Sequence, residues 1–143
     1  MKYTSISILI PVFNEKQTIK ECIQRVLASD TCNLTKEIIV SDNNSTDGTK
    51  EILKEFSDDR IKCLFKDKNE GKGSNIINAL NYAKGDLILF QDADLEYNPE
   101  NYPDLISPFL NHDADVVYGS RLTGSKITKI LGWPNLLGNK IFT

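Results

Sequence analysis

Apolar residues are concentrated in five short runs that are separated by longer segments of mixed character. Each run is rich in Ile, Val or Leu and is bounded by polar or turn-forming residues, which is typical of a buried β-strand. The runs occupy residues 5–11, 37–41, 61–65, 86–91 and 115–118. We therefore predict five strands at these positions.

The segments between these runs repeat their apolar residues with the period of a helix. The first carries an apolar face made of Ile19, Cys22, Ile23, Val26 and Leu27. Three further helices are predicted: one after Thr49; one with the apolar stripe Ile76, Ile77, Leu80 and Ala83 that ends at Lys84-Gly85; and one that begins near Asn98-Pro99 and is short or kinked because of Pro103 and Pro108. Strands that alternate with helices predict an α/β fold, with a mostly parallel sheet and helices on both faces.

Composition and charge narrow the class of protein. The chain has 143 residues, 40% of them hydrophobic and 26% charged, which suffices for one domain with a sizeable core. A net charge of -3 without a long Lys/Arg run argues against a nucleic-acid partner. Cys22, Cys32 and Cys63 form no close pair in the sequence. No disulfide framework is therefore predicted, and a cytoplasmic location fits best.

Polar residues follow each predicted strand, and ligands of parallel α/β sheets bind beyond these carboxyl ends. Asp92 and Asp94 leave the fourth strand directly after its apolar run, where two neighbouring carboxylates need a cation to compensate their charge. Mg2+ or Mn2+ suits this position, because these ions take oxygen ligands and keep positions open for substrate phosphates. Glu96 can join the metal site directly or through water. The alternative is that all three are solvated turn residues.

Three other strand ends carry candidate ligand contacts. Asp42 can accept a hydrogen bond from a ligand ring N–H or a ribose hydroxyl, whereas residues 43–48 that follow it also suit a turn and a helix cap. The sequence NEGKG at 69–73 is either a phosphate cradle, with Lys72 at a helix N-terminus, or an ordinary turn. Arg121 can clamp a phosphate or form a surface ion pair.

Taken in order, these segments resemble the family-2 glycosyltransferases with the GT-A fold, most closely the branch that transfers sugars to polyprenyl phosphates, such as dolichyl-phosphate mannose synthases. The matching segments are ILIPVFNE at 8–15, STDGT at 45–49, NEGKG at 69–73, GD at 85–86, DADLE at 92–96 with PE at 99–100, and GSR at 119–121. The resemblance implies a Rossmann-like GT-A fold and a nucleotide-sugar donor. The substrate-binding residues that it implies are Pro11, Phe13, Asn14, Glu15, Asp42, Lys72 and Asp92. Together with the residue chemistry it assigns the metal to Asp92, Asp94 and Glu96, and catalysis to Asp94 and Arg121.

The sequence departs from the pattern of these relatives at two positions. Asn43 is neutral where a second Asp usually follows Asp42, and Glu96 stands where glutamine is common. A carboxylate at position 96 would strengthen metal binding but repel a substrate phosphate. The sequence also stops at Thr143, whereas relatives continue into a segment that completes the acceptor site. We expect residues 1–125 to form the nucleotide-sugar-binding core and residues 126–143 to begin that acceptor segment, which is truncated.

The expected reaction is metal-dependent, inverting transfer of a sugar from a UDP- or GDP-linked donor to an acceptor, in the synthesis of a cell-envelope glycan or glycoconjugate. A polyprenyl phosphate is the expected acceptor, because a phosphate monoester is largely dianionic at neutral pH and needs no side-chain base. Two alternatives stay open. One is a non-catalytic module that binds nucleotide sugar, and the other is a transferase that acts on a saccharide hydroxyl with a base from sequence beyond Thr143.

Residues 126–143 are basic and amphipathic, with three lysines and no acidic residue. Such a segment can lie on an anionic membrane surface, form part of a truncated core, or mediate self-association. Gly132 and Pro134 would interrupt a continuous helix, which weighs against the membrane account. The expected location is the cytoplasm, with peripheral attachment to the inner face of the membrane where the acceptor is a lipid phosphate.

Overall fold

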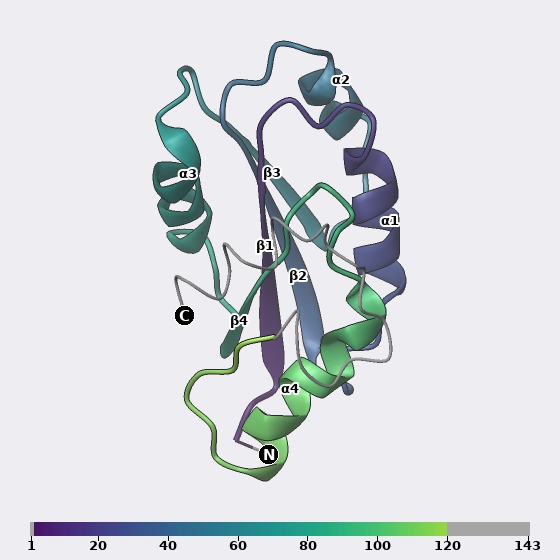
Figure 1. The fold of residues 1–143 in the computed structure, drawn as a ribbon, viewed down its shortest axis with the longest axis vertical. Coiled ribbons are helices and arrows are strands. Elements are labelled where there is room, and N and C mark those ends of the chain that lie inside the picture. The colour runs from purple at the N-terminus through teal and green to yellow at the C-terminus, as the bar shows by residue number, and fades with distance from the viewer. Residues whose placement is uncertain (1, 120–143) are drawn as a thin grey trace, which may run out of the picture.

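The computed structural model describes residues 2–119, which are built around a four-stranded parallel sheet (Figure 1). The strands are β1 (Ser5–Val12), β2 (Thr35–Asp42), β3 (Ile61–Phe65) and β4 (Leu87–Phe90). They lie in the order β3-β2-β1-β4, so β1 is central and pairs with β2 and β4. Because every pairing is parallel, all four carboxyl ends lie at one edge of the sheet, as the first four predicted strands require.

Helices cover both faces of this sheet, which confirms the predicted fold class (Figure 1). Helices α1 (Ile19–Ala28), α2 (Thr49–Lys54) and α4 (Tyr102–Asn111) contribute to the core cluster on one face, and α3 (Gly71–Leu80) packs on the other. The 3-10 turn η1 (Pro99–Asn101) leads directly into α4. Among the residues that the structure describes, no helix combines the length and apolarity needed to span a membrane.

The main core lies between the sheet and α1. Ile6, Ile8 and Ile10 of β1 point to this side, because alternate strand residues share a face. The predicted apolar face of α1 meets them, with Ile23 and Val26 fully buried. On the opposite face Leu9 packs in a smaller cluster with residues of β2 and α3. β1 is therefore covered on both sides, and this explains why its sequence is almost uninterruptedly apolar.

The third helix differs from its prediction in both its length and its buried face. It ends at Leu80 and does not reach Lys84-Gly85. The predicted stripe residues Ile77 and Leu80 are 61% and 44% exposed, whereas Asn75 and Ala79 are buried against the sheet. The reason is a polar contact: the side chain of Asn75 bonds to main-chain and side-chain atoms of β1 and β2, and this rotates the helix away from the orientation that hydrophobicity alone favours.

The prediction of a fifth strand is wrong. Residues 115–118 form no strand and pair with no part of the four-stranded sheet. Val116 is 64% exposed and Tyr118 is 90% exposed, so these side chains do not pack against the core as a buried strand would require. An isolated extended segment gains no ladder hydrogen bonds, and β-branched or aromatic residues favour a strand only where they can pack. Within residues 2–119, the carboxyl edge of the sheet is therefore formed by the ends of four strands.

Gly85, predicted as a helix terminus, instead allows the chain to pass close to β1. Its N–H donates to Ser7 Oγ over 2.8 Å. A Cβ atom at this position would lie 2.4 Å from the Ser7 nitrogen, which is backbone and cannot move aside without disturbing the pairing of the central strand. The close approach therefore requires glycine immediately before β4.

We predict opposite effects for alanine at two glycines. Gly85→Ala should lower the free energy of unfolding by about 1–3 kcal/mol, because of the clash with β1. Gly73→Ala should raise it by about 0.5–1 kcal/mol, because Gly73 lies within α3 with no atom within 4 Å of an added Cβ. Urea unfolding followed by circular dichroism measures both. Equal stability of the two variants would contradict the packing described for Gly85.

Candidate functional site

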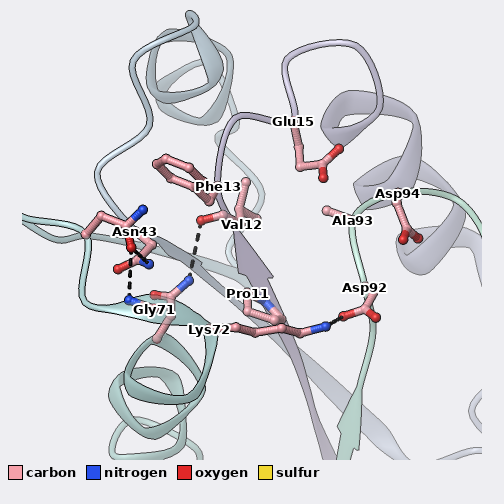
Figure 2. Close-up of a pocket in the computed structure, with 12 residues that line it drawn as sticks. Pro11, Val12, Phe13, Glu15, Asn43, Gly71, Lys72, Asp92, Ala93 and Asp94 are labelled. Atoms are coloured by element: carbon pink, nitrogen blue, oxygen red, sulfur yellow. Dashed lines mark hydrogen bonds and ion pairs between the residues drawn. The ribbon is translucent and has the colours of Figure 1, made fainter.

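A pocket of about 320 Å³ opens at the carboxyl edge of the sheet, beside the N-terminus of α3 (Figure 2). Each strand contributes residues to it, either from its end or from the loop that follows. The lining residues are Pro11, Val12, Phe13, Glu15, Asn43, Asn69, Gly71, Lys72, Asn75, Asp92, Ala93 and Asp94. The structure thus brings together six of the predicted site residues: Pro11, Phe13, Glu15, Lys72, Asp92 and Asp94.

One side of the pocket is acidic. Figure 2 shows Glu15, Asp92 and Asp94 on this side, whereas Phe13 and Asn43 lie on the other. The same charges act on the buried thiol of Cys22. Burial, followed by the negative charges of Asp94 and Glu15, raises the pKa of Cys22 to about 12. This side of the pocket is therefore suited to a cation.

The opposite wall is suited to an anion. Lys72, in the first turn of α3, crosses the pocket to Asp92, with 2.7 Å between its Nζ and the Asp92 Oδ1 (Figure 2). Gly71 begins the helix with a φ of 85°, a conformation that residues with a side chain rarely adopt. The N-terminus of a helix attracts anions through its unpaired N–H groups and its dipole. A phosphate at this wall and a metal ion at the acidic side would be direct neighbours.

Asn43 has a clear structural role that explains why this position is not acidic. Its side chain is buried, its Nδ2 donates to Asn69 Oδ1 over 2.6 Å, and its Oδ1 accepts from the Glu70 N–H over 3.2 Å. A carboxylate could accept the second bond but could not donate the first. The neutral amide therefore ties the end of β2 to the loop that begins α3.

Asn75 is a pocket residue that the sequence pattern did not reveal. It is 1% exposed and sits between the ends of β1 and β2, where its Nδ2 donates to the carbonyls of Ser41 (2.6 Å) and Val12 (3.4 Å) and its Oδ1 accepts from Ser41 Oγ (2.6 Å). Hydrophobic periodicity cannot detect a buried polar residue. The only available signal was its position four residues before Ala79 on the same helical face.

Two predicted substrate contacts lie away from the pocket lining, Asp42 in the interior and Asn14 on the exposed surface. Asp42 is fully buried; its Oδ1 accepts from the Ser45 N–H over 3.0 Å, and within the described residues its Oδ2 has no hydrogen-bond partner. Asn14 joins two loops, because its Oδ1 accepts from the Thr46 N–H and its own N–H donates to Ser45 Oγ. Neither residue lines the pocket, so their contacts with a ligand stay predictions.

Asp92 and Asp94 supply part of the ligand set that a hard divalent ion needs. Asp92 and Asp94 offer oxygen ligands at an open pocket, and the ion pair with Lys72 shows that Asp92 accepts a positive partner. Within residues 2–119 no group of three or more His, Cys, Asp or Glu side chains is arranged around one point, and Glu96 does not line the pocket. Two carboxylates completed by substrate phosphates would match the preference of Mg2+ and Mn2+. Arg121 and residues 126–143 lie outside the described residues.

Comparison with known proteins gives consistent matches. The sequence model of a family described as "Glycosyl transferase family 2" matches residues 7–141. The dolichol-phosphate mannosyltransferase of Pyrococcus furiosus is 34% identical over 90% of this chain and 36% of its own length. The undecaprenyl-phosphate 4-deoxy-4-formamido-L-arabinose transferase of Edwardsiella ictaluri is 35% identical over 71% of this chain and 32% of its own length.

A solved structure also matches. The glucosyl-3-phosphoglycerate synthase of Mycobacterium tuberculosis, crystallised with Mn2+, UDP and glucosyl-3-phosphoglycerate, has a TM-score of 0.60 and 26% identity, over 76% of this chain and 40% of the synthase. The present chain spans about a third of the length of the curated relatives that it matches.

Replacing Asp47 near the pocket by asparagine should destabilise the fold. Asp47 accepts hydrogen bonds from Thr49 and from the Lys16 N–H, so Asp47→Asn should lower the free energy of unfolding by about 0.5–1.5 kcal/mol. Urea unfolding at pH 7 measures the difference, and a variant as stable as wild type would contradict the role of these hydrogen bonds.

The effect at Asp47 should also depend on pH. Burial raises the pKa of Asp47, but the hydrogen bonds from Thr49 and Lys16 outweigh it and leave the pKa below its ordinary value. A carboxyl group whose pKa falls on folding stabilises the protein above its unfolded pKa of about 3.9 and loses that effect as the pH falls through the folded value. The difference between wild type and Asp47→Asn should therefore shrink in acid.

Proposed function

The chain belongs to glycosyl transferase family 2, and from this we propose that its pocket binds a nucleotide-diphosphate sugar together with Mg2+ or Mn2+. The complete protein then transfers the sugar, with inversion, to a polyprenyl phosphate. Support for the acceptor class comes from the two curated relatives, whose names specify dolichol phosphate and undecaprenyl phosphate. Support for the donor and ion comes from the Mycobacterium tuberculosis synthase, which was crystallised with UDP and Mn2+.

One observation carries the proposal: a pair of carboxylates and a helix N-terminus face each other across a single pocket. Asp92 and Asp94 supply negative charge on one side, and Lys72 at the start of α3 supplies positive charge on the other. A diphosphate with a divalent ion has the complementary arrangement, since its oxygens suit the helix and its ion suits the carboxylates. A neutral ligand would complement neither charged wall.

The nucleoside is proposed to lie on the side of the pocket that carries Phe13, away from Asp92 and Asp94 (Figure 2). Phe13 is 44% exposed there, and an aromatic side chain offers a face for a base or ribose. Pro11, from the end of the same strand, also lines the pocket. Asp42 lies in the interior, and its unpaired buried Oδ2 would gain a partner from a ring N–H of the base if the wall shifts on binding.

The residues of the chain hold the donor so that its leaving group faces the acidic loop. Asp92 and Asp94 would hold the ion, and the ion would supply electrostatic stabilisation of the negative charge on the departing nucleoside diphosphate. Lys72 contributes a second positive charge on the same phosphates. A phosphate acceptor is already largely dianionic at pH 7, so the attack on the anomeric carbon needs no general base. Arg121 is proposed as a further phosphate contact, and the acceptor lipid implies peripheral attachment to the cytoplasmic face of a membrane.

Calorimetry with UDP- and GDP-sugars, each with and without Mn2+, tests the donor and the ion. We expect one base to bind more tightly and to require the ion. Asp94→Asn should weaken that binding roughly 30-fold or more, the equivalent of about 2 kcal/mol, because it removes one of two charged ligands. Asp104→Asn is the control, since this exposed residue of α4 carries the same charge away from the pocket. Ion-independent binding, or equal effects of the two variants, would refute the proposal.

Lys72→Met should have effects of opposite sign on two ligands. It frees Asp92 from an exposed ion pair, whose strength of about 0.2–1 kcal/mol predicts Mn2+ binding that is up to about fivefold tighter without nucleotide. It also removes a phosphate contact, so binding of the nucleotide sugar with Mn2+ should weaken. Lys68→Met is the control, because Lys68 pairs with Glu70 in the neighbouring loop and does not line the pocket. A change of the same sign for both ligands would exclude this role for Lys72.

A further inference from the structure

The loop that carries Asp92 and Asp94 is anchored to the protein interior by a buried hydrogen-bond network. Gln91 follows β4 and is 1% exposed. Its Nε2 donates to the carbonyl of Asp92 over 2.9 Å and to the carbonyl of Tyr97 over 3.3 Å. One side chain therefore binds both ends of the six-residue segment 92–97, which contains both carboxylates and Glu96.

Tyr102, the first residue of α4, determines which way the Gln91 amide points. Its hydroxyl is buried and donates to Gln91 Oε1 over 2.7 Å. Burial raises the pKa of Tyr102, so the hydroxyl keeps its proton. The reversed amide would set its oxygen against two carbonyl oxygens, which cannot donate. The geometry and the chemistry of the donors therefore allow only the observed orientation of the amide.

The Asp92 carbonyl receives a second donor from the opposite side. The Cys22 thiol of α1 lies 3.7 Å from the same oxygen and donates to it. A carbonyl oxygen has two lone pairs, and both are used here. The peptide plane after Asp92 is thus fixed, and with it the direction in which the Asp92 side chain leaves the main chain.

The segment between these anchors is conformationally strained. Leu95 has a φ of 64°, which costs energy in a residue with a branched side chain and persists only where surrounding contacts enforce it. The Glu96 N–H also donates to Asp94 Oδ1 over 3.0 Å. Without the anchors at Asp92 and Tyr97, we expect this turn to relax and the two carboxylates to separate.

We propose that Gln91 and Tyr102 are positioning residues that hold Asp92 and Asp94 in the arrangement needed to bind the divalent ion. Neither residue lines the pocket, so they act through the loop and touch no ligand. The proposal extends the proposed function, on which its ion-binding part rests. It also couples α4 to the pocket, because the hydroxyl that orients Gln91 belongs to the first residue of this helix.

The test compares Gln91→Met with the double variant Gln91→Met/Tyr102→Phe in the full chain. Gln91→Met removes the amide at similar length but leaves the Tyr102 hydroxyl buried without this acceptor, so it lowers the melting temperature. The double variant also removes that hydroxyl, which restores part of the stability, although the carbonyls of Asp92 and Tyr97 still lack the Gln91 donor. The affinity for Mn2+, measured by calorimetry with the metal alone, should nevertheless stay about 10-fold or more weaker in both variants, the range seen when residues that orient metal ligands are lost.

Ile106→Val is the matched control, because Ile106 is buried in α4 one turn from Tyr102 and contributes only packing. It should lower the melting temperature and leave the affinity for Mn2+ unchanged. If the double variant binds Mn2+ as tightly as wild type, or if Ile106→Val weakens binding as much as the double variant does, the positioning role is overturned.

Hydrogen–deuterium exchange of residues 92–97 separates this proposal from the proposed function. Faster exchange in Gln91→Met than in wild type and Ile106→Val is expected, because the loop loses its anchors. If wild type fails to bind Mn2+, the proposed ion site falls, and exchange alone then decides whether the network holds the loop. Unchanged exchange in Gln91→Met would overturn the network itself.

Discussion

Negative charge at the end of the edge strand β4 is the constraint around which this edge of the sheet is organised. Asp92 and Asp94 lie in the loop after β4, whose inner face is buried against the core. Carboxylates in such a position need positive partners. The structure supplies one from Lys72, across the pocket, and leaves the carboxylates open to another from outside. The same arrangement therefore stabilises the pocket without a ligand and supports the proposal that it binds a metal–diphosphate pair.

Neutral polar side chains hold the walls of this pocket in place. Asn75 closes the gap between the ends of β1 and β2, Asn43 ties β2 to the start of α3, and Gln91 anchors the acidic loop to α4. Amides are suited to these positions because each donates and accepts hydrogen bonds without adding charge. Charge is thereby kept for the residues that face the ligand, and the supporting residues remain buried and neutral.

The glycines near the site serve two separate purposes. Gly71 permits a left-handed backbone conformation at the first residue of α3, where the helix N-terminus meets the pocket. Gly85 permits β4 to approach β1 closely enough to pair. The first shapes the wall that is proposed to bind an anion, and the second positions the strand that leads to the carboxylates. Both walls therefore depend on backbone geometry as well as on side-chain chemistry.

The sequence by itself determined the parallel α/β class, four strands and the carboxylate pair, because strand burial and helical periodicity are local patterns and strand ends of a parallel sheet must meet. It did not determine the orientation of α3, the failure of residues 115–118 to form a strand, or the network below Asp92. These depend on contacts between residues distant in the sequence. Asn75 and Gln91 show the physical reason: a buried amide is placed by its hydrogen-bond partners, and only the tertiary structure specifies them.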